Sequence, residues 1–302
     1  MGVPSMKKFL LVLLVVMTAI CLAACGGSSN TSNPTGSSAQ SEPSAGGSSS
    51  ASKRVSIQEE VIFDQNDIKV TAKSLDPTGS IFGATVAVLI ENNSSKNITV
   101  QARNSAVNGV MVDTLFSCDV TAGKKANDTI TFSASDLKRA GIEVIKEIQF
   151  QLHFFNTESW DTIVDSDPII ITTDADPSFV QQYDDSGVVL LDTKGFRIVA
   201  QGLDETSSIL GTELLLYIEN NTDNNVTIQV RDVSVNGFMV GTIFSCDVLA
   251  GNKAFDDITF MKSDLEKNSI KDINEIDLSF HIFDANSWNT ILDSEPITIT
   301  FE

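Results

Sequence analysis

A long segment of the chain occurs twice, and this duplication limits the available folds more than any other feature. Residues 107–123 (VNGVMVDTLFSCDVTAG) return as residues 235–251 (VNGFMVGTIFSCDVLAG), a shift of 235 − 107 = 128 positions. Carried outward without a gap, the shift pairs residues 61–174 with 189–302, and roughly half of the paired positions are identical. A chain of 302 residues also corresponds to about two domains of roughly 150 residues each. The sequence therefore predicts two tandem copies of one domain.

The first 24 residues have the pattern of an export signal. Lys7 and Lys8 precede an apolar run from Phe9 to Ile20, which has the length of a signal-peptide core and is short for a bilayer span. Residues 22–25 read Leu-Ala-Ala-Cys, which resembles the lipobox of bacterial lipoproteins. The resemblance implies removal of residues 1–24 and lipid modification of Cys25. An ordinary secretory signal with a chance cysteine is the alternative, and translation from Met1 or from Met6 is left open.

The next segment is too polar to fold. Residues 26–52 are almost wholly Ser, Gly, Ala, Asn, Thr and Pro, which cannot bury enough apolar area to offset their conformational entropy. A flexible chain of this length spans about 30 Å. We therefore expect a signal peptide (1–24), a lipidated cysteine and tether (25–52), repeat 1 (53–174), a linker (175–187) and repeat 2 (188–302), held at the extracellular face of the cell membrane.

Both repeats have the texture of antiparallel β-structure. Short alternating apolar runs are rich in β-branched and aromatic residues, as in strands. In repeat 1 they cover residues 68–72, 84–90, 98–100, 129–132, 148–152 and 169–172. Turn signals such as Asn92-Asn93-Ser94 and Asn108-Gly109 separate them, and one short helix capped by Ser135 is expected at 135–141. The prediction is an all-β fold of two immunoglobulin-like β-sandwiches.

A strand, an Asn-rich turn and a second strand recur at equivalent places in the two repeats. Residues 90–100 read IENNSSKNITV, and residues 218–228 read IENNTDNNVTI. This pattern resembles the immunoglobulin-like domains of uncharacterised surface lipoproteins from Gram-positive bacteria, and the similarity covers both repeats. It implies a β-sandwich at the cell surface. It carries no catalytic residue to this chain.

Charge and cysteine content exclude some classes of protein. Acidic residues exceed basic ones by 40 − 20 = 20, so phosphate backbones are repelled and nucleic acid is not expected as a partner. Cys118 and Cys246 occupy equivalent core-facing strand positions, which predicts buried, inert thiols. A bridge between them is the alternative, although two core positions of separate domains are hard to bring together.

Histidine and tryptophan supply the candidate ligand-binding residues, one of each per repeat. His153 and His281 lie on strands and point away from the core set by strand alternation, without the close spacing of a metal motif. Trp160 and Trp288 follow a serine in a turn. Such an aromatic residue can stack on a sugar or a peptide, but sealing the end of a sandwich core is its more common use.

Acidic turns are the candidate calcium ligands. Asp161, Asp165 and Asp167 in repeat 1, and Asp293 and Glu295 in repeat 2, lie near strand ends, where carboxylates and carbonyls could converge on a hard cation. The spacing of an EF-hand loop is absent, and Asn289 replaces the first of these acids in repeat 2. No cofactor is expected otherwise.

These features favour a non-enzymatic, membrane-anchored binding or scaffolding module, whose partner is a protein or a cell-wall ligand. Two sandwiches on one tether multiply weak contacts through effective concentration, and no nucleophile or cofactor motif is visible. The alternative is a cell-envelope hydrolase or an enzyme inhibitor that uses the tryptophans, the histidines and nearby carboxylates. Convergence of these groups in one cleft of each repeat would favour the alternative.

Overall fold

The computed structural model describes residues 55–206 and 208–301. The expected signal sequence, Cys25 and the whole of the expected tether lie outside the described residues. The strands of repeat 1 are β1 (Glu60–Gln65), β2 (Ile68–Ser80), β3 (Gly83–Asn92), β4 (Ile98–Val107), β5 (Val110–Met111), β6 (Thr114–Leu115), β7 (Ser117–Val120), β8 (Lys124–Ser133), β9 (Glu147–Asn156), β10 (Thr162–Asp165) and β11 (Ile169–Thr172), with one helix, α1 (Ala134–Arg139). Every predicted strand is present, and most are longer than the apolar run that indicated them.

Repeat 2 has the same elements in the same order. Its strands are β12 (Val188–Thr193), β13 (Phe196–Asp204), β14 (Gly211–Asn220), β15 (Val226–Val235), β16 (Phe238–Met239), β17 (Thr242–Ile243), β18 (Cys246–Val248), β19 (Lys253–Met261), β20 (Glu275–Asp284), β21 (Thr290–Asp293) and β22 (Ile297–Thr300), with one helix, α2 (Lys262–Lys267). The prediction of an all-β fold with tandem immunoglobulin-like β-sandwiches is confirmed.

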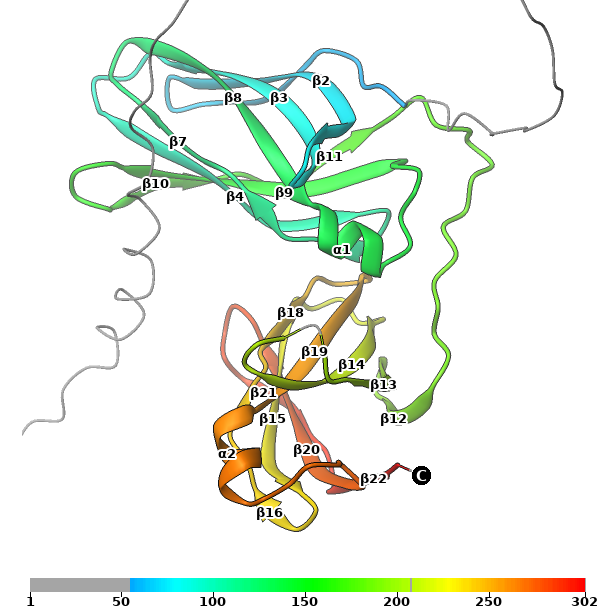
Figure 1. Cartoon of the computed structure of the whole chain (residues 1–302). Coiled ribbons are helices and arrows are strands. Elements are labelled where there is room, and N and C mark those ends of the chain that lie inside the picture. The colour runs from blue at the N-terminus through cyan, green and yellow to red at the C-terminus, as the bar shows by residue number, and fades with distance from the viewer. Residues whose placement is uncertain (1–54, 207, 302) are drawn as a thin grey trace, which may run out of the picture. The chain divides into compact units, whose positions relative to one another are not determined.

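Each repeat consists of two layers of antiparallel strands. In repeat 1 one layer runs β1-β2-β3-β8-β6, and the other centres on β10-β9-β4, with β7 and β11 paired to β4 and β9 (Figure 1). Repeat 2 repeats this plan, with β12-β13-β14-β19 in one layer and β15-β20-β21 in the other. A single parallel pair, Val110 with Lys253, joins β5 to β19.

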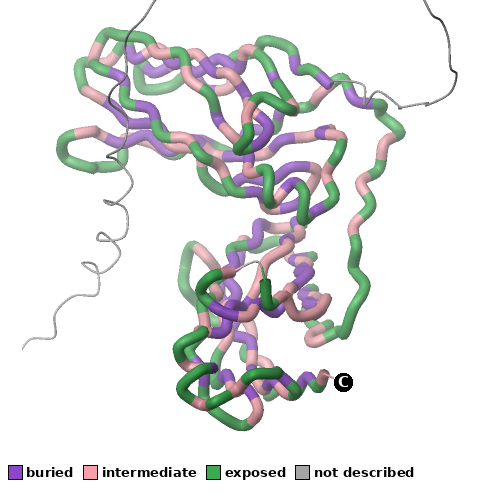
Figure 2. The backbone as a smooth tube through the Cα atoms, in the orientation of Figure 1, coloured by how far each residue is buried: buried purple, intermediate pink, exposed green. Residues whose placement is uncertain are grey.

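The core of each sandwich lies between its layers. Buried residues alternate with partly buried ones along most of β3 and along the first half of β9, as the twofold period of a strand requires, and Figure 2 shows this alternation. In repeat 1, Phe154 of β9 is fully buried, and its ring centroid lies 4.3 Å from that of Phe63 on the opposite layer. The equivalent position in repeat 2 holds Ile282, which is also fully buried.

A buried asparagine side chain connects the Asn-rich turn to the neighbouring strand through hydrogen bonds. Asn92 is fully buried, and its Nδ2 donates to the carbonyl oxygens of Lys96 and Val120 at 2.8 and 2.9 Å. Its Oδ1 accepts from the backbone and hydroxyl of Ser94. Asn220 makes the same contacts in repeat 2. A buried amide is tolerated only when it is hydrogen-bonded, so this motif is explained by the fold.

The short helix α1 begins at Ala134, one residue before the expected start at 135. Ser133, and not Ser135, caps α1, because its side chain accepts from the backbone of Asp136. Asp136 in turn accepts a hydrogen bond from the backbone of Asp113 at 2.9 Å. The serine predicted as the cap of α1 is therefore the wrong one. In repeat 2 Met261 stands at the equivalent position and makes no side-chain capping hydrogen bond.

The two repeats differ in the segment that precedes the first strand. In repeat 1, Val55 and Ile57 are buried in the core cluster, and Ser56 exchanges backbone and side-chain hydrogen bonds with Asp174. The equivalent residues of repeat 2 are Tyr183–Asp185 in the linker. Tyr183 donates instead to the carbonyl of Asn108 in repeat 1. Lys146 of repeat 1 also contacts the linker, because its Nζ donates to the carbonyls of Pro177 and Phe179 at 2.8 Å each.

Among the described residues, no helix is both long and apolar enough to cross a membrane.

Candidate functional site

The predicted histidines lie on the outer surface of the β9 and β20 layers. Residues 150, 152 and 154 of β9 point into the core, so His153 and Phe155 point outward on the other side. Their ring centroids lie 5.3 Å apart, and those of His281 and Phe283 lie 5.2 Å apart. The prediction that the histidines face away from the core is confirmed. Neighbouring side chains nevertheless cover each histidine, which is only 8% exposed.

Each histidine is paired with a carboxylate on the neighbouring strand. His153 Nδ1 lies 2.5 Å from Asp165 Oδ1, and His281 Nδ1 lies 2.6 Å from Asp293 Oδ1. The pairs form because Asp165 is directly opposite His153 in the β9–β10 register, and Asp293 is opposite His281 in β20–β21. The carboxylates are more than half exposed, so the pairs lie at the protein surface.

The tryptophans do not seal the sandwich core, and that expectation is wrong. Trp160 is 73% exposed and Trp288 is 74% exposed. Each indole instead stacks on the outward phenylalanine, with centroids 5.5 Å apart and planes 18° apart for Trp160–Phe155 and 17° for Trp288–Phe283. The order of rings is therefore histidine, phenylalanine, tryptophan in both repeats.

The turn before β10 holds the tryptophan in this position. Trp160 and Trp288 both have φ of +63°, in the left-handed region that costs a bulky residue about 1–2 kcal/mol. Asn156 Oδ1 accepts from the backbones of Glu158 and Ser159, and the Trp160 backbone donates to the carbonyl of Asn156. Asp284 makes the corresponding contacts in repeat 2. These hydrogen bonds maintain a conformation that the tryptophan alone would not adopt.

Polar side chains of two more strands extend this surface. Thr99 and Gln101 of β4 lie opposite Phe155 and His153, and β7 adds the next row. Thr99 Oγ1 donates to Asp119 Oδ1 at 2.6 Å, and Thr227 donates to Asp247 at 2.5 Å. We use "outer face" for Thr99, Gln101, Arg103, Ser117, Asp119, His153, Phe155, Trp160, Thr162 and Asp165, and for their counterparts Thr227, Gln229, Arg231, Ser245, Asp247, His281, Phe283, Trp288, Thr290 and Asp293.

Comparison of the repeats separates the outer face from the core beneath it. Along residues 98–103, 117–120, 150–155 and 162–165 of repeat 1, nine of ten outward positions carry the same residue in repeat 2, the exception being Gln151 with Ser279. Of the ten inward positions in the same segments, only three are identical. Thr99, His153 and Phe155 are themselves buried among their neighbours, whereas Arg103, Ser117, Asp119, Thr162 and Asp165 are exposed and are also identical in repeat 2. Substitutions at exposed positions usually change stability by no more than about 0.5 kcal/mol, so stability does not account for the identity of these five residues.

The acidic turns are not gathered into a cation cage. Among the described residues, no three side chains of His, Cys, Asp or Glu lie close enough together to hold a metal ion. Asp161 accepts from Ser159 Oγ at 2.8 Å, and Asp165 and Asp293 are paired with histidine. Asp167 and Glu295 contribute only their backbone carbonyls, to Ser166 and Ser294. Calcium binding stays a prediction.

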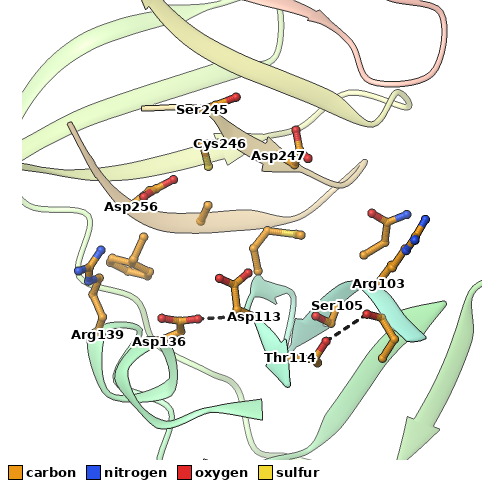
Figure 3. A pocket seen from close by; sticks show the side chains of 15 residues that line it. Arg103, Ser105, Asp113, Thr114, Asp136, Arg139, Ser245, Cys246, Asp247 and Asp256 are labelled. Carbon is orange, nitrogen blue, oxygen red and sulfur yellow. Dashed lines mark hydrogen bonds between the residues drawn. The ribbon is translucent and has the colours of Figure 1, made fainter. Parts of the chain in front are cut away.

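A hollow of about 500 Å³ is lined by residues of both repeats, among them Arg103, Ser245 and Asp247 from the margins of the two outer faces (Figure 3). Asp113, Asp136, Arg139, Cys246 and Asp256 are among its lining residues, and burial raises the pKa of Asp256 above its usual value. At the edge of this hollow the Arg139 guanidinium lies 2.9 Å from Asp257. The hollow does not include the histidines or the tryptophans.

Both cysteines of the repeats are buried and free, as predicted. Burial raises the pKa of the Cys118 thiol to about 12, and the nearby Asp128 acts in the same direction. Burial also holds the pKa of Cys246 well above its usual value. A thiol that stays protonated at neutral pH is a poor nucleophile, so these residues have the character of small core side chains.

Sequence reasoning found the histidines and tryptophans but missed the residues that connect them. Phe155 and Phe283 were assigned no role, and the rows of Thr99 and Gln101 were not singled out. The available signal was the combination of strand period with the internal repeat: alternate residues that stay identical while their neighbours change lie on one face of the sheet.

Comparison with known proteins adds little to this description. No family model and no curated protein matches the sequence. Among solved structures, the chain is similar to the Salmonella enterica SafA pilin in complex with the SafB chaperone, with 13% identity, a TM-score of 0.21, and coverage of 72% of this chain and 89% of that one. It is also similar to the YadV chaperone, with 11% identity, a TM-score of 0.24, and coverage of 78% and 100%. At these scores the likenesses carry no argument.

The fold and the outer face together define a class of protein: a tandem β-sandwich in which each repeat presents the same open surface of aromatic and hydrogen-bonding side chains.

Proposed function

We propose that the protein is a membrane-anchored extracellular binding module, in which each repeat binds ligand through its outer face. The observation that carries this proposal is that the repeats are more alike on the outer face than in the core. Nine of ten outward positions are identical, but only three of ten inward positions are. Packing constraints alone would produce the opposite pattern, because exposed positions tolerate substitution better than buried ones. A shared ligand explains why the exposed residues stay the same.

The arrangement supports binding more than catalysis. Trp160, His153 and Asp165 do converge in repeat 1, as the enzyme alternative requires. They lie on an open sheet surface, however, and four hollows in the described part of the chain are lined by other residues. Water exclusion is what strengthens catalytic electrostatics, and an open face does not provide it.

The lipid anchor of the proposal rests on the sequence of residues 1–52. Cys25 is the lipidated residue in this account, and the polar segment after it is the tether. Detergent phase partitioning tests the anchor. The full chain should enter the detergent phase, and Cys25→Ala should move it to the aqueous phase. An unchanged distribution would remove the anchor from the proposal.

Retention on immobilised cell-envelope fractions tests the binding face. Full-length protein with both Trp160→Ala and Trp288→Ala should lose retention at least tenfold, because both platforms are removed. Phe82→Ala with Leu210→Ala is the matched control: these apolar residues are 62% and 49% exposed in equivalent hairpins and lie off the outer face. Equal losses in the two double variants would contradict the proposal.

Calcium enters the same experiment as a variable. If the acidic turns with Asp161, Asp165 and Asp167 hold calcium as a ligand bridge, retention should fall when a chelator is added. Retention that is unchanged by chelation assigns the binding to the outer face without a cation.

A further inference from the structure

The outer face also indicates what kind of ligand it takes, on the condition that the proposed binding function holds. Trp160 and Trp288 each stack on a phenylalanine and are still 73% and 74% exposed. An indole that is supported on one side and open on the other is a rigid flat platform. Its binding costs little conformational entropy, because the turn already fixes its orientation.

The residues beside the platform are hydrogen-bonding groups with fixed positions. In repeat 1 the row Asp165, His153, Gln101 and Ser117 crosses four neighbouring strands, and Thr99 with Asp119 forms the row next to it. Repeat 2 has the same rows, with Gln229 Nε2 donating to Ser245 Oγ at 3.4 Å. The face therefore offers carboxylate acceptors together with amide and hydroxyl groups that both donate and accept.

Charge and shape narrow the ligand further. The chain carries a formal charge of −20, and each outer face has two carboxylates exposed against one arginine, so an anionic polymer is repelled. The apolar residues under the face are buried, so it has no pocket for the aliphatic side chains of a peptide. A ligand with one apolar flat side and many hydroxyl groups, and no charge, fits both conditions.

We propose that each outer face binds a pyranose ring of a neutral glycan, with the sugar's C–H side against Trp160 or Trp288 and its hydroxyl groups hydrogen-bonded to the adjacent polar rows. No bond is made or broken. One site in each repeat suits a polymer, because a repeating ligand presents the same unit to both faces.

The chain contains its own reporter for this proposal. It has two tryptophans, and both are in the proposed sites. Intrinsic tryptophan fluorescence of the full-length protein therefore reports on the platforms alone, and Trp160→Phe or Trp288→Phe leaves a single reporter in a known repeat. The probes are chitohexaose and cellohexaose, two neutral oligosaccharides that differ in the acetamido group.

Titration with at least one of these glycans should give a saturable change in emission. Each single Trp→Phe variant should retain about half of the amplitude, and Phe82→Ala should behave like the wild type. A second measurement by calorimetry on Trp160→Ala with Trp288→Ala should show at least a tenfold loss of affinity, with an unchanged thermal transition as evidence that the variant is folded.

The outcomes distinguish this inference from the proposed function. If neither glycan changes the emission or gives heat at concentrations of about 10 mM, well above a millimolar Kd, while the double tryptophan variant still loses envelope retention, the glycan is wrong and a protein ligand takes its place. If glycan binds equally well to the double variant, the platform is wrong. If the variant Trp160→Ala with Trp288→Ala keeps both its glycan binding and its envelope retention, both proposals are wrong.

Discussion

The two repeats agree on their outer faces and differ in the cores beneath those faces. Trp160, Phe155 and His153 have the same partners, at distances within 0.1 Å, as Trp288, Phe283 and His281. Beneath them, Phe154 is replaced by Ile282, and the core is still fully buried. A sandwich core can be filled by different sets of apolar side chains, provided that the members of each set fit one another site by site. A binding surface requires particular groups, so it preserves what the core is free to change.

The largest expected effect separates the two cores. Phe154→Ala removes a fully buried ring stacked on Phe63 and should destabilise repeat 1 by about 3–5 kcal/mol. Calorimetry should then show an early transition for repeat 1 and an unshifted one for repeat 2. The variant Ile282→Ala is the converse control. A single transition that moves as a whole in both variants would show that the repeats unfold together.

The segment before the first strand gives the next largest difference. Ile57 is 8% exposed in the core of repeat 1, and Ile57→Ala should cost about 2–4 kcal/mol. Its counterpart in repeat 2 is Asp185, an exposed partner of Arg197 at 3.1 Å. Because exposed ion pairs contribute little, Asp185→Ala should change stability by less than about 1 kcal/mol. Urea unfolding measures both, and equal costs would mean that the two repeats are closed in the same way.

Avidity tests whether the two identical faces act together. On an immobilised neutral polysaccharide, Trp160→Ala alone should weaken apparent affinity at least tenfold, which is about 1.4 kcal/mol. On a short soluble oligosaccharide it should only halve the number of sites. Surface plasmon resonance and calorimetry provide the two readings. The same twofold effect on both ligands would show that the faces bind independently.

The smallest effect concerns pH and distinguishes the two turns. Backbone hydrogen bonds from Ser287 hold the pKa of Asp284 below its usual value of 3.8, whereas Asn156 in repeat 1 does not titrate. Asp284 therefore stabilises its turn above about pH 4, and this stabilisation is lost as the pH falls through the lowered pKa. Acrylamide quenching of Trp288, measured in Trp160→Phe, should rise between about pH 5 and pH 2.

Trp160, measured in Trp288→Phe, is the control and should show no such rise over the same range. Asp284→Asn should abolish the change at Trp288. An equal rise at both tryptophans would assign the effect to general acid unfolding.

The sequence predicted the architecture well, because the duplication and the strand alternation can both be read directly from the order of residues. It could not place the tryptophans, since the left-handed turn that turns Trp160 onto Phe155 depends on contacts from Asn156. It also misplaced the helix cap, since Ser133 and Ser135 are equivalent in propensity and only the end of β8 decides between them. The pairing of His153 with Asp165 required the β9–β10 register, including its bulge, which no sequence pattern reveals.

The divergence of the two cores has a further consequence for how the chain reaches its native state. Neighbouring domains of similar sequence can exchange strands while they fold and become trapped in misassembled forms. The inward residues of β9 and β20 differ in size at each corresponding position. Phe150, Leu152 and Phe154 in repeat 1 correspond to Leu278, Phe280 and Ile282 in repeat 2. A strand placed in the wrong sandwich would overfill one site and leave a void at the next. The same substitutions that leave each core intact thus make an exchanged pair of strands a poor competitor during folding.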